Sequence, residues 1–139
     1  MEKCVCIFVN SETEKGIEQK KEKLLEYCLI QEDFPVVVLS IRTVGNYLEE
    51  EGIRCLLDLV EENIIDMVLV DTVSDITNSP IRLDELLKKL SFHGVTLKTP
   101  RSNVDYDEYH NFLCDLGIVR EENTPWILRI IRGLGIYDK

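Results

Sequence analysis

The feature that most constrains this chain is a short apolar run at residues 64–70, followed at once by a polar loop. Asp66 is the only charged residue that interrupts the run, and the composition is typical of a strand buried on both faces of a parallel sheet. Residues 71–79 are mostly polar and lead into Pro80, which suits the first position of a helix. In an open α/β sheet, ligands bind at the carboxyl ends of central strands, so the 71–79 loop is the first place to look for function.

Apolar strand-like runs alternate with amphipathic helical segments along most of the chain. The predicted strands are residues 4–9, 36–41, 64–70 and 95–98, and the predicted helices between them are residues 17–30, 46–62 and 80–92. Right-handed crossovers then predict an α/β fold, with a parallel or mostly parallel four-stranded sheet flanked by helices. After Pro100 the pattern is helical, over residues 106–116 and 126–134. We therefore predict a single domain over 1–139, with the sheet and its helices in 1–100 and an α-helical C-terminal extension in 101–139.

The charge balance argues against a dedicated nucleic-acid surface. The formal net charge is −10 and the pI is about 4.7, whereas such a surface needs clustered Lys and Arg. No apolar run approaches the ~20 residues that cross a bilayer, and no signal peptide is recognisable. We expect a cytoplasmic protein with no membrane partner and no strong direct binding of nucleic acid.

Residue spacing predicts no cofactor and no metal. Five cysteines fall mostly in apolar segments, with no C-x-x-C pair and no Cys/His cluster of zinc spacing. Gly16 stands alone after the first strand, without the G-x-G-x-x-G of a dinucleotide site. Buried free thiols in a reducing compartment are the expectation for these cysteines.

Several segments together resemble the catalytic domain of the serine recombinases, the resolvase and invertase family. Ser11 follows the first strand and precedes a helix, as the serine does at the family's Tyr-x-Arg-Val-Ser strand end. Residues 50–63 are similar to the family's Arg-x-Gly-Leu-x-x-Leu-Leu helix, and residues 65–70 to its third strand. Residues 86–97 are similar to its Leu-x-x-x-Gly-Val-x-Leu step from helix to strand. The resemblance covers about residues 4–98 and implies a resolvase-like fold.

The resemblance also implies a chemistry, in which a serine oxygen attacks a DNA phosphate and arginines stabilise the charge that develops. The family's serine falls on Ser11, with Asn10 as a competing register. The arginine two residues before it falls on Val9, or on Phe8 in the other register. The other active-site positions of the family fall on Glu50, Ser74, Asp75 and Asn78.

Every arginine that the resemblance calls for is replaced, and at Glu50 and Asp75 the replacement is a carboxylate. We therefore expect a catalytically inactive serine-recombinase-like domain, with Ser11 as a vestigial nucleophile. Such a domain would be a regulatory or accessory protein-interaction module linked to site-specific DNA recombination, working with a protein partner or as a homo-oligomer. One alternative is a small enzyme or phospho-switch that uses the loops of Ser11, Asp71 and Asp75 on a non-DNA substrate. Residual DNA recombination is a third reading.

Residues 126–134 near the C-terminus are apolar around much of a helix circumference. Their apolar side chains either pack onto the domain's own sheet and helices or form a dimer or partner contact, with the tryptophan as anchor. The residues proposed for such an interaction are Trp126, Ile127, Ile130 and Ile131.

Overall fold

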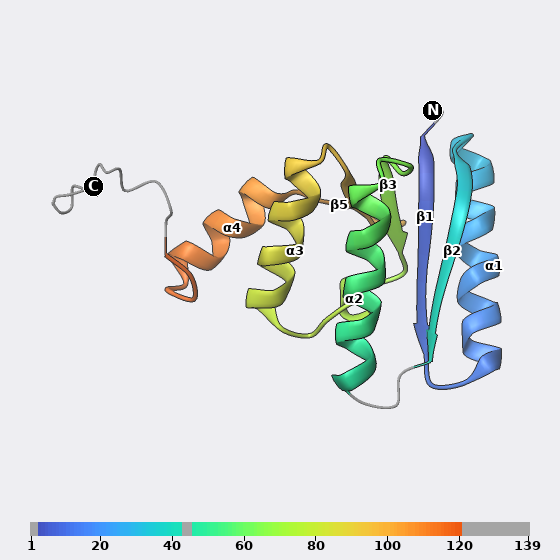
Figure 1. Cartoon of the computed structure of the whole chain (residues 1–139), viewed down its shortest axis with the longest axis horizontal. Coiled ribbons are helices and arrows are strands. Elements are labelled where there is room, and N and C mark those ends of the chain that lie inside the picture. The colour runs from blue at the N-terminus through green and yellow to red at the C-terminus, as the bar shows by residue number, and fades with distance from the viewer. Residues whose placement is uncertain (1–2, 43–45, 121–139) are drawn as a thin grey trace, which may run out of the picture. The chain divides into compact units, whose positions relative to one another are not determined.

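A computed structural model of the chain describes residues 3–42 and 46–120 (Figure 1). Its elements follow the order β1 (Cys4–Ser11), α1 (Glu14–Gln31), β2 (Phe34–Arg42), α2 (Asn46–Glu61), β3 (Met67–Val70), a 3₁₀ turn η1 (Val73–Asp75), α3 (Pro80–Phe92), β4 (Thr96–Lys98), β5 (Asn103–Val104) and α4 (Tyr106–Asp115). The chain divides into two compact units, residues 1–106 and 107–139, which are described separately. The first unit contains the whole sheet.

The sheet has the strand order β2-β1-β3-β4-β5. Strands β1 to β4 are mutually parallel, and β5 pairs antiparallel with β4. The predicted α/β fold with a mostly parallel sheet is confirmed, and the structure adds β5 to the four predicted strands. A tight turn creates this fifth strand: Thr99 N donates to Ser102 O at 2.8 Å and Ser102 N donates to Thr99 O at 3.3 Å, which folds the chain back beside β4.

Helices cover the two faces of the sheet unequally: α1 lies on one face, and α2 and α3 lie on the other (Figure 1). On the α1 face, Ile7 and Val9 of β1 and Leu69 of β3 pack against Ile17 and Leu24 of the helix. On the α2 face, a Cβ added at Gly52 would lie 3.3 Å from the Phe8 ring and 3.4 Å from Ile41. Strands β1 and β3 are therefore buried from both sides, as expected for the centre of a parallel sheet.

The predicted strand at 64–70 begins later than its apolar run does. Ile64 is 45% exposed, and β3 starts at Met67 because Asp66 interrupts the apolar pattern. Asp66 instead bonds the first residue of β1: its N–H donates to Cys4 O at 2.7 Å, and its Oδ2 accepts from Cys4 N at 3.0 Å. The carboxylate thus satisfies a backbone donor that the sheet leaves unpaired.

Helix α1 begins earlier than residue 17, because Thr13 caps its N-terminus and accepts a hydrogen bond from Gly16 N at 3.0 Å. This extra turn brings the start of α1 next to the carboxyl end of β1. Helix α4 supplies the predicted helical segment of the second unit, but the predicted interaction residues Trp126, Ile127, Ile130 and Ile131 lie outside the described residues. In the part of the chain that the structure describes, no helix is both long and apolar enough to cross a membrane.

Candidate functional site

The candidate site lies at the carboxyl ends of β1 and β3, where a lysine of α1 joins the end of β1 to the η1 turn that follows β3. Lys20 Nζ donates to the Asn10 carbonyl oxygen at 2.9 Å and to both carboxylate oxygens of Asp75, at 2.9 and 3.0 Å. The Asn10 side chain completes the network by donating from Nδ2 to the Asp75 carbonyl oxygen at 2.8 Å. One cation therefore holds the end of β1 and the η1 turn together.

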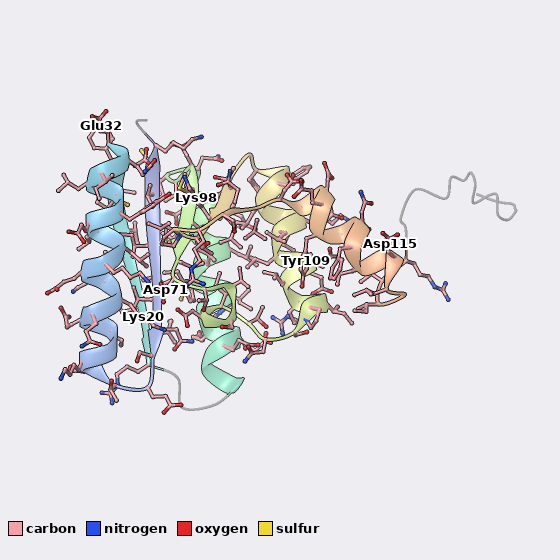
Figure 2. The ribbon with its side chains drawn as sticks, turned by 180° about the vertical axis from the view of Figure 1, so that it is seen from behind. Lys20, Glu32, Asp71, Lys98, Tyr109 and Asp115 are labelled. Atoms are coloured by element: carbon pink, nitrogen blue, oxygen red, sulfur yellow. The ribbon has the colours of Figure 1, made fainter. Side chains whose placement is uncertain are left out.

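A second lysine of α1 repeats this arrangement one turn further along the helix. Lys23 Nζ lies 2.7 Å from Asp71 Oδ1, at the residue that directly follows β3. Figure 2 shows Lys20 and Asp71 near one another at this end of the sheet. Both carboxylates on the carboxyl side of the central strand are thus paired with cations of the chain itself.

Asp75 is the more enclosed of the two carboxylates, with 12% of its side chain exposed. Burial is the largest influence on its pKa and raises it; the hydrogen bond and charge of Lys20 act in the opposite direction, and Asp71 raises it further. The net result is a pKa above the ordinary value of an aspartate. Lys20 therefore only partly offsets the cost of placing this carboxylate away from water.

Ser11 lies in β1, and its hydroxyl is turned toward the first turn of α1. Thr13 N donates to Ser11 Oγ at 3.4 Å, a long hydrogen bond. A Cβ added at Gly16 would overlap Ser11 Oγ and lie 3.0 Å from Ser11 Cβ. The hydroxyl therefore fills the space that the missing side chain of Gly16 leaves, whereas the neighbouring Asn10 is the residue that contacts the η1 turn.

The position assigned to the family's first arginine is part of the apolar core in either register. Val9 is 0% exposed and packs in the cluster beneath α1, and Phe8 is 2% exposed on the opposite face of β1. A guanidinium at either position would have to be buried without a carboxylate partner from that cluster, which is costly. The sheet is thus packed where the family pattern places a phosphate-binding cation.

Glu50 on α2, the next position where the family pattern has an arginine, is solvent-exposed and ion-paired. Its carboxylate contacts Arg82 of α3, with Arg82 Nη2 donating to Glu50 Oε1 at 2.8 Å and Nη1 contacting Oε2. The adjacent Glu49 accepts a hydrogen bond from the buried Thr77 hydroxyl at 3.0 Å. These contacts join α2 to the far end of the 71–79 loop and to α3.

The two remaining predicted positions carry no cation. Ser74 Oγ lies 3.0 Å from Thr72 Oγ1 within the loop, and Asn78 is exposed. The structure therefore brings Asn10, Ser11 and Asp75 to one end of the sheet, places Val9 in the core, and uses Glu50 to link two helices. Lys20 and Lys23 are not among the predicted site residues, because both belong to a run of charged residues in α1, a pattern typical of a solvated helix face. The signal was their three-residue spacing, which places both ammonium groups on one side of the helix.

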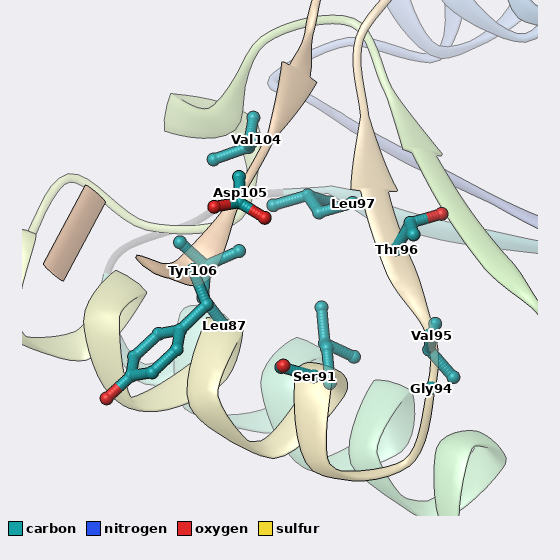
Figure 3. A pocket seen from close by; sticks show the side chains of 10 residues that line it. Leu87, Ser91, Gly94, Val95, Thr96, Leu97, Val104, Asp105 and Tyr106 are labelled. Atoms are coloured by element: carbon teal, nitrogen blue, oxygen red, sulfur yellow. The ribbon is translucent and has the colours of Figure 1, made fainter. Parts of the chain in front are cut away.

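Two further features of the described residues bear on where a ligand could bind. No group of three or more His, Cys, Asp or Glu side chains is placed there to hold a metal ion. A cavity of about 180 Å³ opens between the end of α3 and strands β4 and β5, where it is lined mainly by Leu87, Leu97, Val104 and Tyr106 (Figure 3). None of the predicted site residues that the structure describes lines this cavity.

Comparison with known proteins identifies the fold. No family model and no curated protein sequence matches the chain. The N-terminal catalytic domain of TP901-1 integrase superposes with a TM-score of 0.67 at 17% identity, covering 84% of this chain and 92% of that one. The C-terminal catalytic domain of ISC1926 TnpA, an IS607-like serine recombinase, gives a TM-score of 0.59 at 17% identity, covering 91% and 93%.

The chain therefore has the fold of a serine recombinase catalytic domain, as the sequence resemblance predicted. At this level of identity the likeness concerns the path of the backbone and carries no catalytic residue with it.

Proposed function

We propose that this chain is a catalytically inactive serine-recombinase-like domain that works as a regulatory or accessory protein-interaction module in site-specific DNA recombination. The observation that carries the proposal is the Lys20–Asp75 ion pair. Asp75 occupies a position where the family resemblance calls for an arginine, and the chain's own lysine neutralises it.

Electrostatics supports this reading. Phosphoryl transfer needs cations aimed at the oxygens where negative charge develops. A carboxylate ~4 Å from a phosphate instead repels it by about 4 kcal/mol at the effective dielectric of a protein surface. Asp75 adds such a carboxylate to the loop, and Lys20 does no more than balance its charge. Because Lys20 is already bonded to three oxygens, it has no donor to spare for a phosphate.

The charge of the whole chain supports a protein partner over a nucleic-acid partner. A net charge of −10 repels the DNA backbone at long range and reduces encounter with it. An accessory role through a second protein requires no such encounter.

The decisive experiment is an assay for a covalent protein–DNA adduct. The full chain is incubated with supercoiled DNA, the reaction is stopped with detergent, and adducts are sought on a denaturing gel beside an active serine recombinase with its own site. We expect no adduct from this chain. An adduct that forms with the wild type and disappears in Ser11→Ala would overturn the proposal.

A second assay addresses the accessory role itself. Affinity purification of the tagged chain from its native cells, followed by mass spectrometry, should recover a recombinase subunit. A purification that reproducibly returns no protein of DNA recombination would contradict the link to that process.

One contact favours the phospho-switch as the second candidate: Asp71 directly follows the central strand and pairs with Lys23 at 2.7 Å. In that case acetyl phosphate with Mg²⁺ would add the mass of one phosphoryl group to the intact chain. The addition would be lost in Asp71→Asn and kept in Asp58→Asn, a carboxylate on α2.

A further inference from the structure

The sheet of the first unit ends at β2, whose outer edge has no paired strand among residues 3–42 and 46–120. We propose that this edge pairs antiparallel with the same edge of a second copy of the chain, which joins two sheets into one. The inference rests on the proposed role as a protein-interaction module, and it names the surface and the partner.

Strand β2 is long and apolar for an unprotected edge. It has nine residues, and Arg42 at its end is the only charged one. Phe34, Val36 and Val38 are 55%, 48% and 40% exposed. Soluble proteins usually shield free edges with charges, prolines or very short strands, because an apolar edge recruits another strand. Here such devices are confined to the two ends of the strand: Pro35 and a bulge at Val36 near its start, and Arg42 at its end.

The opposite edge of the same sheet is protected. Strand β5 has only two residues, Asn103 and Val104, and so offers little backbone for pairing. The sheet thus has a short edge strand at β5 and a nine-residue apolar edge strand at β2. The β2 edge is therefore the one suited to a partner strand.

The charges at the two ends of β2 point to a second copy as the occupant. Glu32 and Asp33 precede the strand and Arg42 ends it, with no charge between them. An antiparallel pair centred near Val38 places the Arg42 end of each copy beside the acidic end of the other. A parallel pair would bring like charges together, which is unfavourable. This arrangement is self-complementary, as a twofold interface requires.

Arg42 is able to take part in such a contact. Its guanidinium is exposed, and the hydrogen bond from its Nη2 to the Glu12 carbonyl oxygen is 3.4 Å long, at the weak end of the range. Val37 and Leu39, on the α2 face of the strand, are only half-buried in the single chain. Extension of the sheet by a second copy would cover them further.

The test is the mass of the full chain in solution, measured by sedimentation between about 1 µM and about 1 mM. We expect a monomer–dimer equilibrium that Val38→Lys shifts toward monomer by at least about tenfold, because two ammonium groups then meet near the twofold axis. Ile64→Lys is the matched control: Ile64 is 45% exposed and lies outside β2, and the substitution should leave the dimer intact. Circular dichroism confirms that both variants are folded.

A charge exchange tests the orientation and the partner. Arg42→Glu should weaken the dimer, since acidic groups then face one another, and adding Glu32→Arg to it should restore dimerisation. A wild-type chain that stays monomeric over the whole range overturns the proposal, even if its edge binds a strand of a different protein. A dimer that is insensitive to both Val38→Lys and the charge exchange overturns it as well. Neither result bears on the inactivity claim, which depends on the DNA adduct.

Discussion

Lys20 Nζ lies 2.9 Å from Asp75 Oδ1 and 2.9 Å from the carbonyl oxygen of Asn10, so one side chain of α1 bonds both the η1 turn and the end of β1. In this fold the carboxyl ends of the central strands are where a ligand would bind. The chain fills that place with an internal ion pair. The loop after β3 is therefore held by contacts within the protein.

Removing the cation should destabilise the fold. Lys20→Met leaves the Asp75 carboxylate, 12% exposed, without its charged donor, and we expect a loss of about 1–3 kcal/mol in the free energy of unfolding. Lys21→Met is the control: Lys21 pairs with Glu18 at the helix surface and should contribute less than about 0.5 kcal/mol. Urea unfolding of both variants measures the difference. Equal losses in the two variants would mean that the Lys20 network adds nothing specific.

The raised pKa of Asp75 predicts the sign of a pH effect. Because burial favours the protonated carboxyl, the folded state binds a proton more tightly than the unfolded state, whose reference value is 3.8. The stability contributed by this group is therefore present below pH 3.8 and is lost as the pH rises through the folded pKa. Asp75→Asn removes the titration. We expect the wild type to lose stability relative to this variant as the pH rises through that window.

Urea unfolding over a pH series checks the sign, with Glu18→Gln as the control for the loss of one carboxylate from the surface of α1. If the wild type instead gains stability relative to Asp75→Asn as the pH rises, Lys20 outweighs burial at this site. That outcome would mean that Lys20, and not burial, has the largest effect on the pKa of Asp75.

The fold was predictable because the apolar run of β3 and the alternation of strands with helices leave few topologies once crossovers are right-handed. The parts of the structure that the sequence did not predict are those that depend on the local contacts of a polar side chain. Asp66 makes β3 start at Met67, later than its apolar run. The turn at Thr99 adds β5, which has only two residues and is too short to show a strand pattern in the sequence. The charged pattern around Lys20 and Lys23 is typical of a solvated helix face. The sequence alone does not indicate that the loop after β3 packs against this face.

The packing of Ser11 against α1 predicts an unusual response at Gly16. A Cβ there would overlap Ser11 Oγ, so Gly16→Ala should cost about 1–3 kcal/mol of stability despite the better helix propensity of alanine. Gly52→Ala is the matched helical control, since its Cβ would meet Phe8 and Ile41 at 3.3 and 3.4 Å, and it should change stability by less than about 1 kcal/mol. Thermal unfolding measures both. Adding Ser11→Ala to Gly16→Ala should recover part of the loss, and no recovery would show that the Ser11 hydroxyl is not the obstacle.

The packing of β1 also determines which phosphate-binding arginines could be reintroduced. Val9→Arg buries a guanidinium at a position that is 0% exposed, so we expect a loss of about 3–5 kcal/mol, which is enough to unfold much of a marginally stable domain. Glu50→Arg affects a side chain that is 59% exposed and should cost no more than about 1 kcal/mol, even though it breaks the pair with Arg82. Urea unfolding of the two variants measures the difference between an arginine in the core and an arginine on the surface. Phe8→Arg is measured beside them for the alternative register. A Val9→Arg protein that folds with wild-type stability would show that β1 has room for a catalytic arginine, and the structural argument for inactivity would then rest on the 71–79 loop alone.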